Sequence, residues 1–322
     1  MAMANQLTGV KAMRTSAGRI SGLPDCSSNL CFVPTNYVVQ TCVLSKRWKD
    51  LWHSIPTLDF DQTEFLVPNG SNQNIEGPIN FSNFIYTVLL LRDYSNLPKL
   101  RHSWGHIKDD LSRINLWIIA AARRNVESLD LEIINVDSFE LTRLHICNSL
   151  RELKLSFNYA IANPLTIACI SSLQDLHLEH VTFVDNDQTN TLFSSALPVL
   201  KTLILDDCDF RNHNSNRTLT VLVTAKYHPG RYRGPYLKAE ELGSNNSLPH
   251  LKLVRIQNFG GHENEVKFVQ FLLKSAVVLE KMIIVAGTSS EAVSMAKKEV
   301  MKTGERLLTS PRASASVGIL FM

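Results

Sequence analysis

The chain has 322 residues, a length typical of about two domains. Apolar residues make up 44% of the sequence and charged residues 20%, which excludes a mostly disordered chain. The formal net charge of +3 is too small to indicate binding to nucleic acid or a membrane through bulk charge. The longest purely apolar run, Leu116 to Ala122, has seven residues, so no segment is long enough to span a bilayer.

Cysteine usage and the first residues bear on the cellular compartment. The six cysteines are irregularly spaced and form no disulfide framework, which favours free thiols in the reducing cytosol or nucleus. Lys11, Arg14 and Arg19 make the start basic, but it lacks the apolar stretch of a signal peptide. A cleaved organelle-targeting peptide is the alternative interpretation. We predict a cytoplasmic or nuclear protein whose residues 1–18 are disordered.

The first strong pattern in chain order is an amphipathic stretch near residue 50. Its apolar residues share one helical face and include two tryptophans: Leu44, Trp48, Leu51, Trp52 and Ile55. Such a stripe carries so much apolar area that it must be buried, either in its own domain or against a partner. Segments 62–80 and 226–247 are rich in Asn, Gly, Ser and Pro, which is typical of a linker and an insertion loop.

A helix pattern over 111–123 is followed by a repeated spacing of aliphatic residues. Six stretches have large aliphatic residues at relative positions 1, 4 and 6: Val126-Leu129-Leu131, Leu150-Leu153-Leu155, Leu173-Leu176-Leu178, Leu200-Leu203-Leu205, Leu251-Val254-Ile256 and Leu279-Met282-Ile284. Their starts are separated by 24, 23, 27, 51 and 28 residues. The step of 51 indicates a degenerate repeat between two regular ones, around Leu219-Leu222-Thr224.

Periods in the twenties with the pattern L-x-x-L-x-L are typical of a leucine-rich repeat, in which each unit is a short strand and a returning segment. Alternation along such a strand points positions 4 and 6 into the core, and stacked neighbours complete that core. Unrelated amphipathic strands in an α/β domain are the alternative, but four consecutive matches near one period favour the repeat. We therefore expect an α/β fold with a leucine-rich-repeat solenoid, or horseshoe.

The C-terminal part predicts two more helices. One has an apolar face that follows Gly260-Gly261 and consists of Val266, Val269, Leu272, Leu273 and Ala276. The other would begin at Thr288-Ser289-Ser290-Glu291, which has the form of a capping box, and continue to about Met301. Gly304 would then end this helix, as a glycine just beyond a helix C-terminus commonly does.

Several of these motifs together resemble a known family. Gly18 to Asp25, Val33-Pro34-Thr35, Thr41 to Trp52 and Pro56 to Asp61 resemble an F-box of the plant F-box/leucine-rich-repeat family. The pieces Leu248 to Gly260, Val278 to Met282 and Leu307 to Ser314 resemble that family's terminal FBD region. The resemblance covers most of the chain. It implies a small all-α F-box at 19–61, a linker at 62–80, repeats at 81–247 and an FBD region at 248–322 that caps the solenoid.

The resemblance implies an adaptor rather than an enzyme. The F-box of this family docks on the Skp-type subunit of a cullin–RING ubiquitin ligase, and the repeats hold the protein substrate. By position, the adaptor contacts would be Leu23, Pro24, Val43, Leu44, Ser45, Arg47 and Trp48. A tethered substrate would then meet the ubiquitin carrier at high effective concentration, while this chain contributes no reacting group.

One stretch departs from the family pattern. Cys26 to Val33 is shorter than the family's first F-box helix, and polar residues replace apolar ones there. Because Ser and Asn favour turns and caps over helix interiors, we expect this helix to be shortened or unformed. The alternative function is therefore a non-catalytic leucine-rich-repeat scaffold whose degenerate F-box does not recruit the ligase.

The strand positions that alternate away from the core would face the concave surface of the solenoid. In four repeats they include six acids and one lysine, although the whole chain is slightly basic. A solvated acidic face is one interpretation. The other, which we favour because the pattern extends over four repeats, is a surface that docks a basic protein partner. The candidate substrate-binding residues are Asp130, Glu132, Glu152, Lys154, Asp175, His177, Glu179 and Asp206.

Other candidate sites have weak support. Cys26 and Cys31 lack partners at zinc spacing, and we expect no metal and no cofactor. His177 and His180 lie three apart near a strand end, where their directions differ, so a shared ligand site is not favoured. Aromatic and basic residues alternate over 227–238, as on single-stranded nucleic-acid surfaces, but the Pro-Gly and Gly-Pro pairs there favour a loop. With no catalytic motif present, we expect no catalytic residue, no nucleic-acid partner and no membrane partner.

Overall fold

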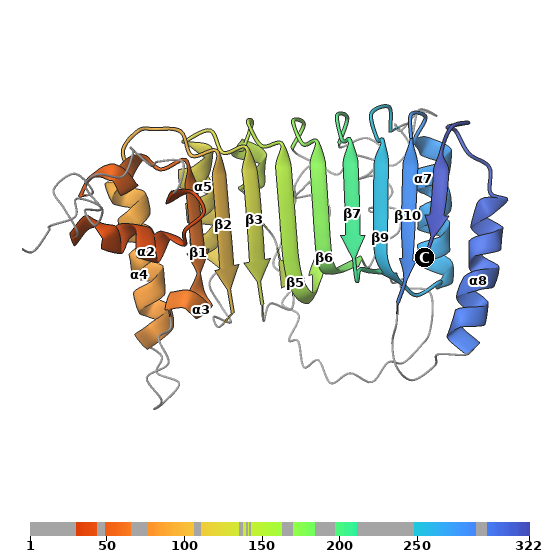
Figure 1. Ribbon diagram of the computed structural model, residues 1–322, viewed down its shortest axis with the longest axis horizontal. Coiled ribbons are helices and arrows are strands. Elements are labelled where there is room, and N and C mark those ends of the chain that lie inside the picture. Colours follow the sequence, from red (N-terminus) through yellow and green to blue (C-terminus); the bar gives the residue numbers. More distant parts are fainter. Residues whose placement is uncertain are drawn as a thin grey trace, which may run out of the picture.

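The computed structural model describes residues 30–43, 49–65, 76–105, 111–134, 138–139, 141, 143–162, 170–183, 197–210, 248–287 and 295–322. Its main feature is one long sheet, in which parallel strands follow the order β1-β2-β3-β5-β6-β7-β9-β10-β11 (Figure 1). Two short strands lie off this path, with β4 paired to β5 and β8 paired to β6.

The strands are β1 (Thr57–Asp61), β2 (Lys99–Trp104), β3 (Ser128–Ile133), β4 (Ser138–Phe139), β5 (Glu152–Ala162), β6 (Asp175–Phe183), β7 (Thr202–Asp206), β8 (Asp209–Phe210), β9 (Leu253–Phe259), β10 (Lys281–Ala286) and β11 (Gly318–Phe321). The α-helices are α2 (Thr35–Gln40), α3 (Gln62–Phe65), α4 (Glu76–Leu91), α5 (Leu111–Ala122), α7 (Glu263–Ser275) and α8 (Met295–Leu308). Short 3-10 helices are η3 (Thr41–Val43), η4 (Leu51–Ser54) and η5 (Leu144–Ile146).

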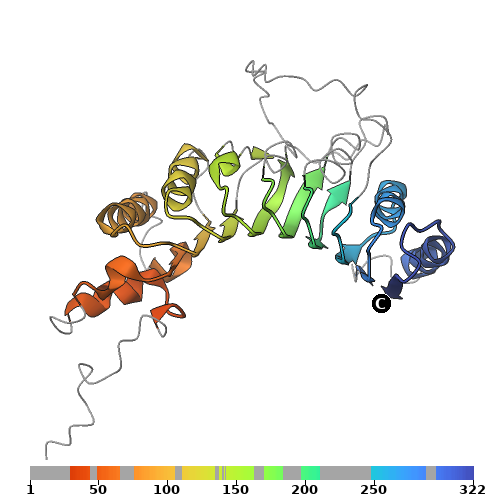
Figure 2. The same ribbon diagram turned by 90° about the horizontal axis from the view of Figure 1, so that it is seen from above.

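The sheet curves, and its helices lie on the outer side of the curve. Figure 2 shows α4, α5, α7 and α8 along this side, while the opposite face of the sheet is open. Among the described residues, no helix is both long and apolar enough to cross a membrane. The expected α/β architecture with a long parallel sheet is therefore confirmed.

The core consists of rows of aliphatic side chains that stand in register across the sheet. One row joins position 4 of neighbouring strands and comprises Leu100, Leu129, Leu153, Leu176 and Leu203. All six predicted stretches are strands, and their residues at positions 1, 4 and 6 are buried. A single strand cannot bury its own apolar face, so each strand depends on its neighbours and on the outer helices.

Three strands of the sheet path were not predicted: β1, β2 and β11. In β1 and β2 the same spacing is present as Ile55-Leu58-Phe60 and Leu97-Leu100-His102, with every one of these residues buried. The aromatic and imidazole rings at position 6 conceal the aliphatic pattern. The parallel sheet therefore begins nearer the N-terminus than the sequence pattern indicates.

The pairing of β7 bears on the degenerate repeat expected near Leu219-Leu222-Thr224. Strand β7 pairs directly with β9, with Thr202 opposite Leu253 and Asp206 opposite Gln257. That register leaves no place for another strand between the two. The three residues lie outside the described part of the chain, as does the loop at 227–238.

The two predicted C-terminal helices have different outcomes. The helix expected at 266–276 is confirmed as α7. Gly304 does not end the second helix, because α8 continues through it to Leu308. A Cβ on Gly304 would stand 3.5 Å from the ring of Phe321, so this residue lies against β11. The helix ends shortly before Pro311, which has no backbone N–H to continue the helical hydrogen bonds. The predicted cap at 288–291 lies outside the described residues.

The N-terminal elements pack against the first strand of the sheet. Trp52 and Ile55 are buried in the same apolar cluster as the strands of the sheet, so core packing is the correct interpretation for these two residues of the stripe. The stripe does not lie on one uninterrupted helix, because residues 49–50 form a turn before η4. The predicted linker at 62–80 contains α3 and the start of α4, whose Pro78 lies in the first turn where proline is tolerated.

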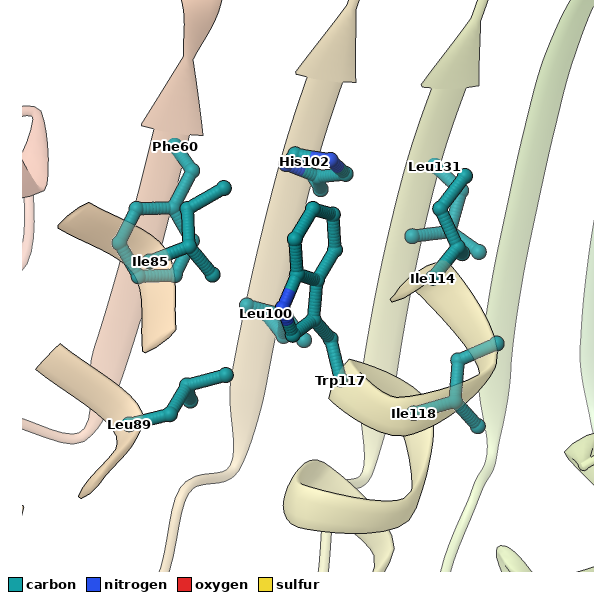
Figure 3. Close-up of a pocket in the computed structure, with 9 residues that line it drawn as sticks. All are labelled: Phe60, Ile85, Leu89, Leu100, His102, Ile114, Trp117, Ile118 and Leu131. Atoms are coloured by element: carbon teal, nitrogen blue, oxygen red, sulfur yellow. The ribbon is translucent and has the colours of Figure 1, made fainter. Parts of the chain in front are cut away.

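His102 replaces leucine in the second core row and is 2% exposed. Figure 3 shows its ring between the side chains of Phe60, Leu131 and Trp117, and the adjacent cavity of about 10 Å³ is too small for an organic ligand. Neither ring nitrogen has a hydrogen-bond partner within the described structure. Burial lowers the pKa of His102 to about 3, and the charge of Arg101 contributes. The imidazole is therefore neutral at neutral pH.

We expect His102→Leu to stabilise the fold, because leucine completes the row and removes a buried polar ring without partners. The expected gain in the free energy of unfolding is about 1–3 kcal/mol. Denaturant unfolding at pH 7 measures it, with the exposed His250→Leu as a control that leaves the midpoint unchanged. A lower midpoint for His102→Leu would contradict this expectation and show that the imidazole ring stabilises the fold.

The same histidine makes stability depend on pH. Its pKa is about 3 in the folded chain and about 6.5 when unfolded, so between these values the unfolded state binds more protons. Stability therefore falls as pH decreases below about 6.5, by about 1.4 kcal/mol per pH unit from this residue. The difference between wild type and His102→Leu, measured at several pH values, isolates this contribution from that of the carboxyl groups. A constant difference from pH 7 to pH 4 would contradict the assignment.

Candidate functional site: the concave face of the sheet

The open side of the sheet carries the side chains that alternate with the buried rows, and we call it the concave face. On β1 to β7 it comprises Thr57, Asp59, Asp61, Lys99, Arg101, Ser103, Ser128, Asp130, Glu132, Glu152, Lys154, Ser156, Asp175, His177, Glu179, Thr202, Ile204 and Asp206. All eight predicted substrate-binding residues lie on this face. When β1 and β2 are included, the face holds eight carboxylates and three basic side chains, so acidic residues still outnumber basic ones.

Arg101 on β2 contacts carboxylates on both neighbouring strands. Its Nη1 donates a hydrogen bond to Asp59 Oδ1 at 2.8 Å and lies 3.4 Å from Asp61 Oδ2. On β3 its guanidinium lies 4.0 Å from Asp130 Oδ2 and 3.7 Å from Glu132 Oε2. Burial alone would lower the pKa of Arg101, but the bond to Asp59 and the surrounding charges raise it overall. One cation is thus shared by four carboxylates.

The aspartates around Arg101 have different electrostatic environments. Burial acts to raise the pKa of Asp61, but hydrogen bonds from Thr63 and the charge of Arg101 outweigh it and lower the pKa. For Asp130 burial has the larger effect, and its pKa is raised although Lys154 and Arg101 oppose the shift. Lys154 and Arg101 thus favour the charged form of Asp130 against its burial, and this carboxylate is part of the internal charge network.

Further along the sheet, two more acids have partners. Lys154 Nζ lies 3.6 Å from Glu179 Oε2 on the next strand. Asp206 accepts hydrogen bonds from Gln257 Nε2 at 2.7 Å and from Asn258 Nδ2 at 3.0 Å. These contacts fix the two carboxylates within the face.

Glu152 and Asp175 are the exception on this face. They stand directly opposite each other on β5 and β6. Within the described residues the structure shows no ion pair or hydrogen bond for either side chain. They border a groove of about 260 Å³ that also contacts Lys154, His177 and Ile204. The groove is open, lies on the candidate face and combines unpaired acids with an aliphatic side chain.

The described residues around this groove include no cluster suited to a metal ion. In the described ranges, no group of three or more His, Cys, Asp or Glu side chains is arranged to hold a metal ion. His180 lies 3.4 Å from Asp207 Oδ2, while the Nε2 of His177 is buried without a partner. Cys31 is partly exposed, and Cys26 lies outside the described residues.

The predicted adaptor-binding residues are largely outside the described structure. Leu23, Pro24, Leu44, Ser45, Arg47 and Trp48 fall in undescribed segments. Val43 is described, and it ends η3 with 82% of its surface exposed. The structure therefore leaves the adaptor contacts as a prediction.

Arg101, Asp59 and Asp61 are the site residues that sequence reasoning missed. Their strands were not recognised, because His102 and Phe60 interrupt the aliphatic pattern. The alternation Leu58-Asp59-Phe60-Asp61 and the one over 99–104 are the signals that could have found them. Strand alternation gives the face of each residue, but the 42-residue separation of Arg101 and Asp59 conceals their contact.

Comparison with known proteins gives two family matches. A model described as FBD matches residues 248–284, and a model described as Leucine Rich Repeat matches residues 172–195. The first match covers β9, α7 and the first four residues of β10, and the second includes β6. The long parallel sheet is consistent with leucine-rich-repeat-type units, and the chain contains an FBD segment.

Individual relatives point to the same family. An FBD-associated F-box protein of Arabidopsis thaliana is 28% identical over 296 residues, which cover 87% of this chain and 67% of the relative. An F-box/LRR-repeat protein of that plant is 33% identical, with coverage of 58% and 49%. An F-box/FBD/LRR-repeat protein is 30% identical, with coverage of 58% and 41%. The chain thus spans less than half of these last two relatives. These matches show that the chain is similar to proteins of the plant F-box/FBD/LRR-repeat family.

We expect Arg101→Met to lower the free energy of unfolding by about 1–3 kcal/mol, because it leaves a cluster of carboxylates without its cation. Denaturant unfolding at neutral pH measures the change. Added salt should reduce it, since salt screens the remaining repulsion between exposed carboxylates. Lys99→Met is the matched control, because Lys99 is exposed on the same strand and face and shows no ion pair within the described residues. Equal effects of the two substitutions would contradict the role of Arg101.

Proposed function

We propose that the protein is a non-catalytic substrate-recognition adaptor of a cullin–RING ubiquitin ligase. In this proposal the N-terminal region docks on a Skp-type adaptor, which binds the cullin, and the repeats hold a protein substrate. Proteins of this family are non-catalytic adaptors, and the matched relatives carry F-box in their names. Similarity to this family is the single observation that carries the proposal.

The finer architecture belongs to the same proposal. The parallel sheet would be the repeat solenoid, with the F-box at one end and the FBD region as a cap at the other. The arrangement of β9, α7 and β10 supports a cap, because this strand–helix–strand unit adds to the sheet edge by parallel pairing. The boundaries 19–61, 62–80, 81–247 and 248–322 remain predictions, as does a cytoplasmic or nuclear location.

Exposed apolar side chains support docking at the N-terminal end. Phe32 is 88% exposed and Val43 is 82% exposed, and Tyr37 projects with 43% of its surface accessible. The opposite side of the same segment is anchored, because Val38 is fully buried and Thr35 Oγ1 accepts a hydrogen bond from the backbone N–H of Asp59 at 2.8 Å. A segment with one anchored side and one apolar exposed side is suited to binding a partner protein.

The scaffold without a working F-box is the second candidate function. It is favoured by the polar stretch at 26–33, where the family has a longer helix, and by the absence of helix over 31–34. Both candidates use the concave face in the same way. They differ only in whether the N-terminal end recruits the ligase.

Co-purification of the full chain with a Skp-type adaptor tests recruitment. We expect a stable complex, and we expect Val43→Asp to weaken it at least about tenfold, because a charge would enter an apolar contact. Leu116→Asp is the matched control, since Leu116 is 53% exposed on α5 and should leave the complex intact.

The outcomes separate the two candidates. A complex sensitive to Val43→Asp and insensitive to Leu116→Asp supports the ligase adaptor. If the folded full chain forms no complex, the ligase role is rejected and the scaffold remains. Equal loss in both variants would mean that the predicted contact at η3 is wrong.

A further inference from the structure

The concave face changes character along the sheet. Strands β1 to β6 present mainly charged side chains, whereas from β7 onward aliphatic side chains also take these positions, next to polar and basic ones such as Thr202, Arg255 and Lys281. The aliphatic set on this face is Ile204, Leu253, Ile283 and Leu320. Ile204 and Leu253 come first after the acids and are partly exposed, and they lie on the neighbouring strands β7 and β9. An acidic area therefore adjoins an apolar one.

Within the acidic area, Glu152 and Asp175 are the carboxylates that remain available. The acids of β1 and β3 share Arg101, Glu179 has Lys154, and Asp206 is held by amide groups of β9. Glu152 is exposed and Asp175 partly exposed. Because paired parallel strands lie about 4.8 Å apart, the two unpaired carboxylates repel each other unless a cation lies between them.

One groove joins these carboxylates to the apolar area. Glu152 and Asp175 border it, and Thr202 and Ile204 border it on β7, with His177 in between. Burial lowers the pKa of His177, so the ring is neutral at neutral pH and does not supply the missing positive charge. Lys99, Asp130 and Lys154 line the groove as well, and Asp130 and Lys154 already have ion-pair partners. The groove thus offers two carboxylates without an ion-pair partner, followed by an aliphatic contact.

The strand spacing sets the distance between the two contacts. From the Glu152–Asp175 pair on β5 and β6 to Ile204 on β7 and Leu253 on β9 is two strand steps, or about 10 Å. A peptide in the polyproline II conformation has three residues per turn and advances about 3.1 Å per residue, so side chains three positions apart point to the same side at about this distance. A peptide laid across the strands would therefore contact both pairs with side chains three positions apart.

We propose that the concave face binds an extended protein segment with a lysine or arginine about three positions from a large apolar residue. The basic side chain binds between Glu152 and Asp175, and the apolar side chain packs on Ile204 and Leu253. Charge complementarity selects the basic residue, and the negative surplus of the face repels nucleic-acid phosphates. This inference rests on the proposed function, because it names the substrate class that the repeats would hold.

The proposal narrows the set of acids that contact the partner. Asp130, which sequence reasoning placed among the partner contacts, is occupied by the network around Arg101. Reversing its charge would disturb that network together with any binding. Glu152 and Asp175 can be neutralised without breaking an ion pair that the described residues show, so they allow a cleaner test.

The test uses a random peptide library displayed on phage and selected on the immobilised full chain. We expect enriched peptides with Lys or Arg three positions from Leu, Ile or Phe, in either chain direction. A synthetic copy of an enriched peptide should bind the double variant Glu152→Gln/Asp175→Asn about five- to thirty-fold more weakly, as expected for two exposed ion pairs. It should also bind Ile204→Asp more weakly than wild type.

A matched control separates this effect from general charge loss. Glu263→Gln/Glu280→Gln removes the same two charges at exposed positions away from the groove and should leave peptide affinity unchanged. Thermal unfolding checks the fold. Glu152→Gln/Asp175→Asn should unfold at the same temperature as wild type or higher, because it relieves repulsion.

The outcomes are distinct from those of the adaptor experiment, because no adaptor is present. Enrichment of the basic–apolar pattern with loss in the groove variant supports the proposal even if co-purification with the Skp-type adaptor fails. It is overturned if no peptide is enriched, if enriched peptides are acidic, or if the groove variant binds as well as wild type. Failure here with a stable adaptor complex would leave the ligase role intact and reject only this substrate class.

Discussion

The structure depends on the parallel, in-register pairing of strands whose side chains alternate between two faces. Leu129, Leu153 and Leu176 stand opposite one another, so the apolar rows run continuously beneath the outer helices. The same register aligns the outward side chains in rows at about the strand spacing. Residues of like charge on adjacent strands are then brought together, as Glu152 and Asp175 are. The register that creates the core thus also creates the electrostatics of the concave face.

Much of the sheet could be predicted from the sequence, because aliphatic residues at positions 1, 4 and 6 report both the strand and its buried side. The prediction was incomplete where another residue type fills a core position. His102 is as buried as the leucines of its row, yet it is a polar residue by composition. Gly304 was misread for a related reason. Glycine is common beyond helix ends, but here it lies inside α8, where the helix packs against Phe321.

The candidate site was predicted in its position but not in its internal pairing. Alternation alone placed all eight predicted substrate-binding residues on the open side of the sheet. Which acids have partners depends on strand order. Arg101 reaches Asp59 across 42 residues, and Gln257 reaches Asp206 across 51. The β7–β9 contact also joins strands on either side of segment 211–247, where the sequence predicts another, degenerate repeat. Such contacts follow from the strand order of the fold, and they cannot be predicted by counting acidic residues along the sequence.

The position of β1 bears on how an adaptor of this kind would work. This strand lies within the range that resembles an F-box, yet it pairs with β2 over five residues and belongs to the repeat sheet. Thr35 joins α2 to the same strand, and one continuous apolar cluster runs from Leu30 through the repeats to Val317. With such continuity, the exposed apolar side chains near η3 and the groove at β5–β7 are held in a fixed relation. Effective concentration depends on how narrowly a connection limits the positions of two sites. A shared strand limits them more narrowly than a flexible linker, and a substrate in the groove would therefore be presented at a defined distance from the docking end.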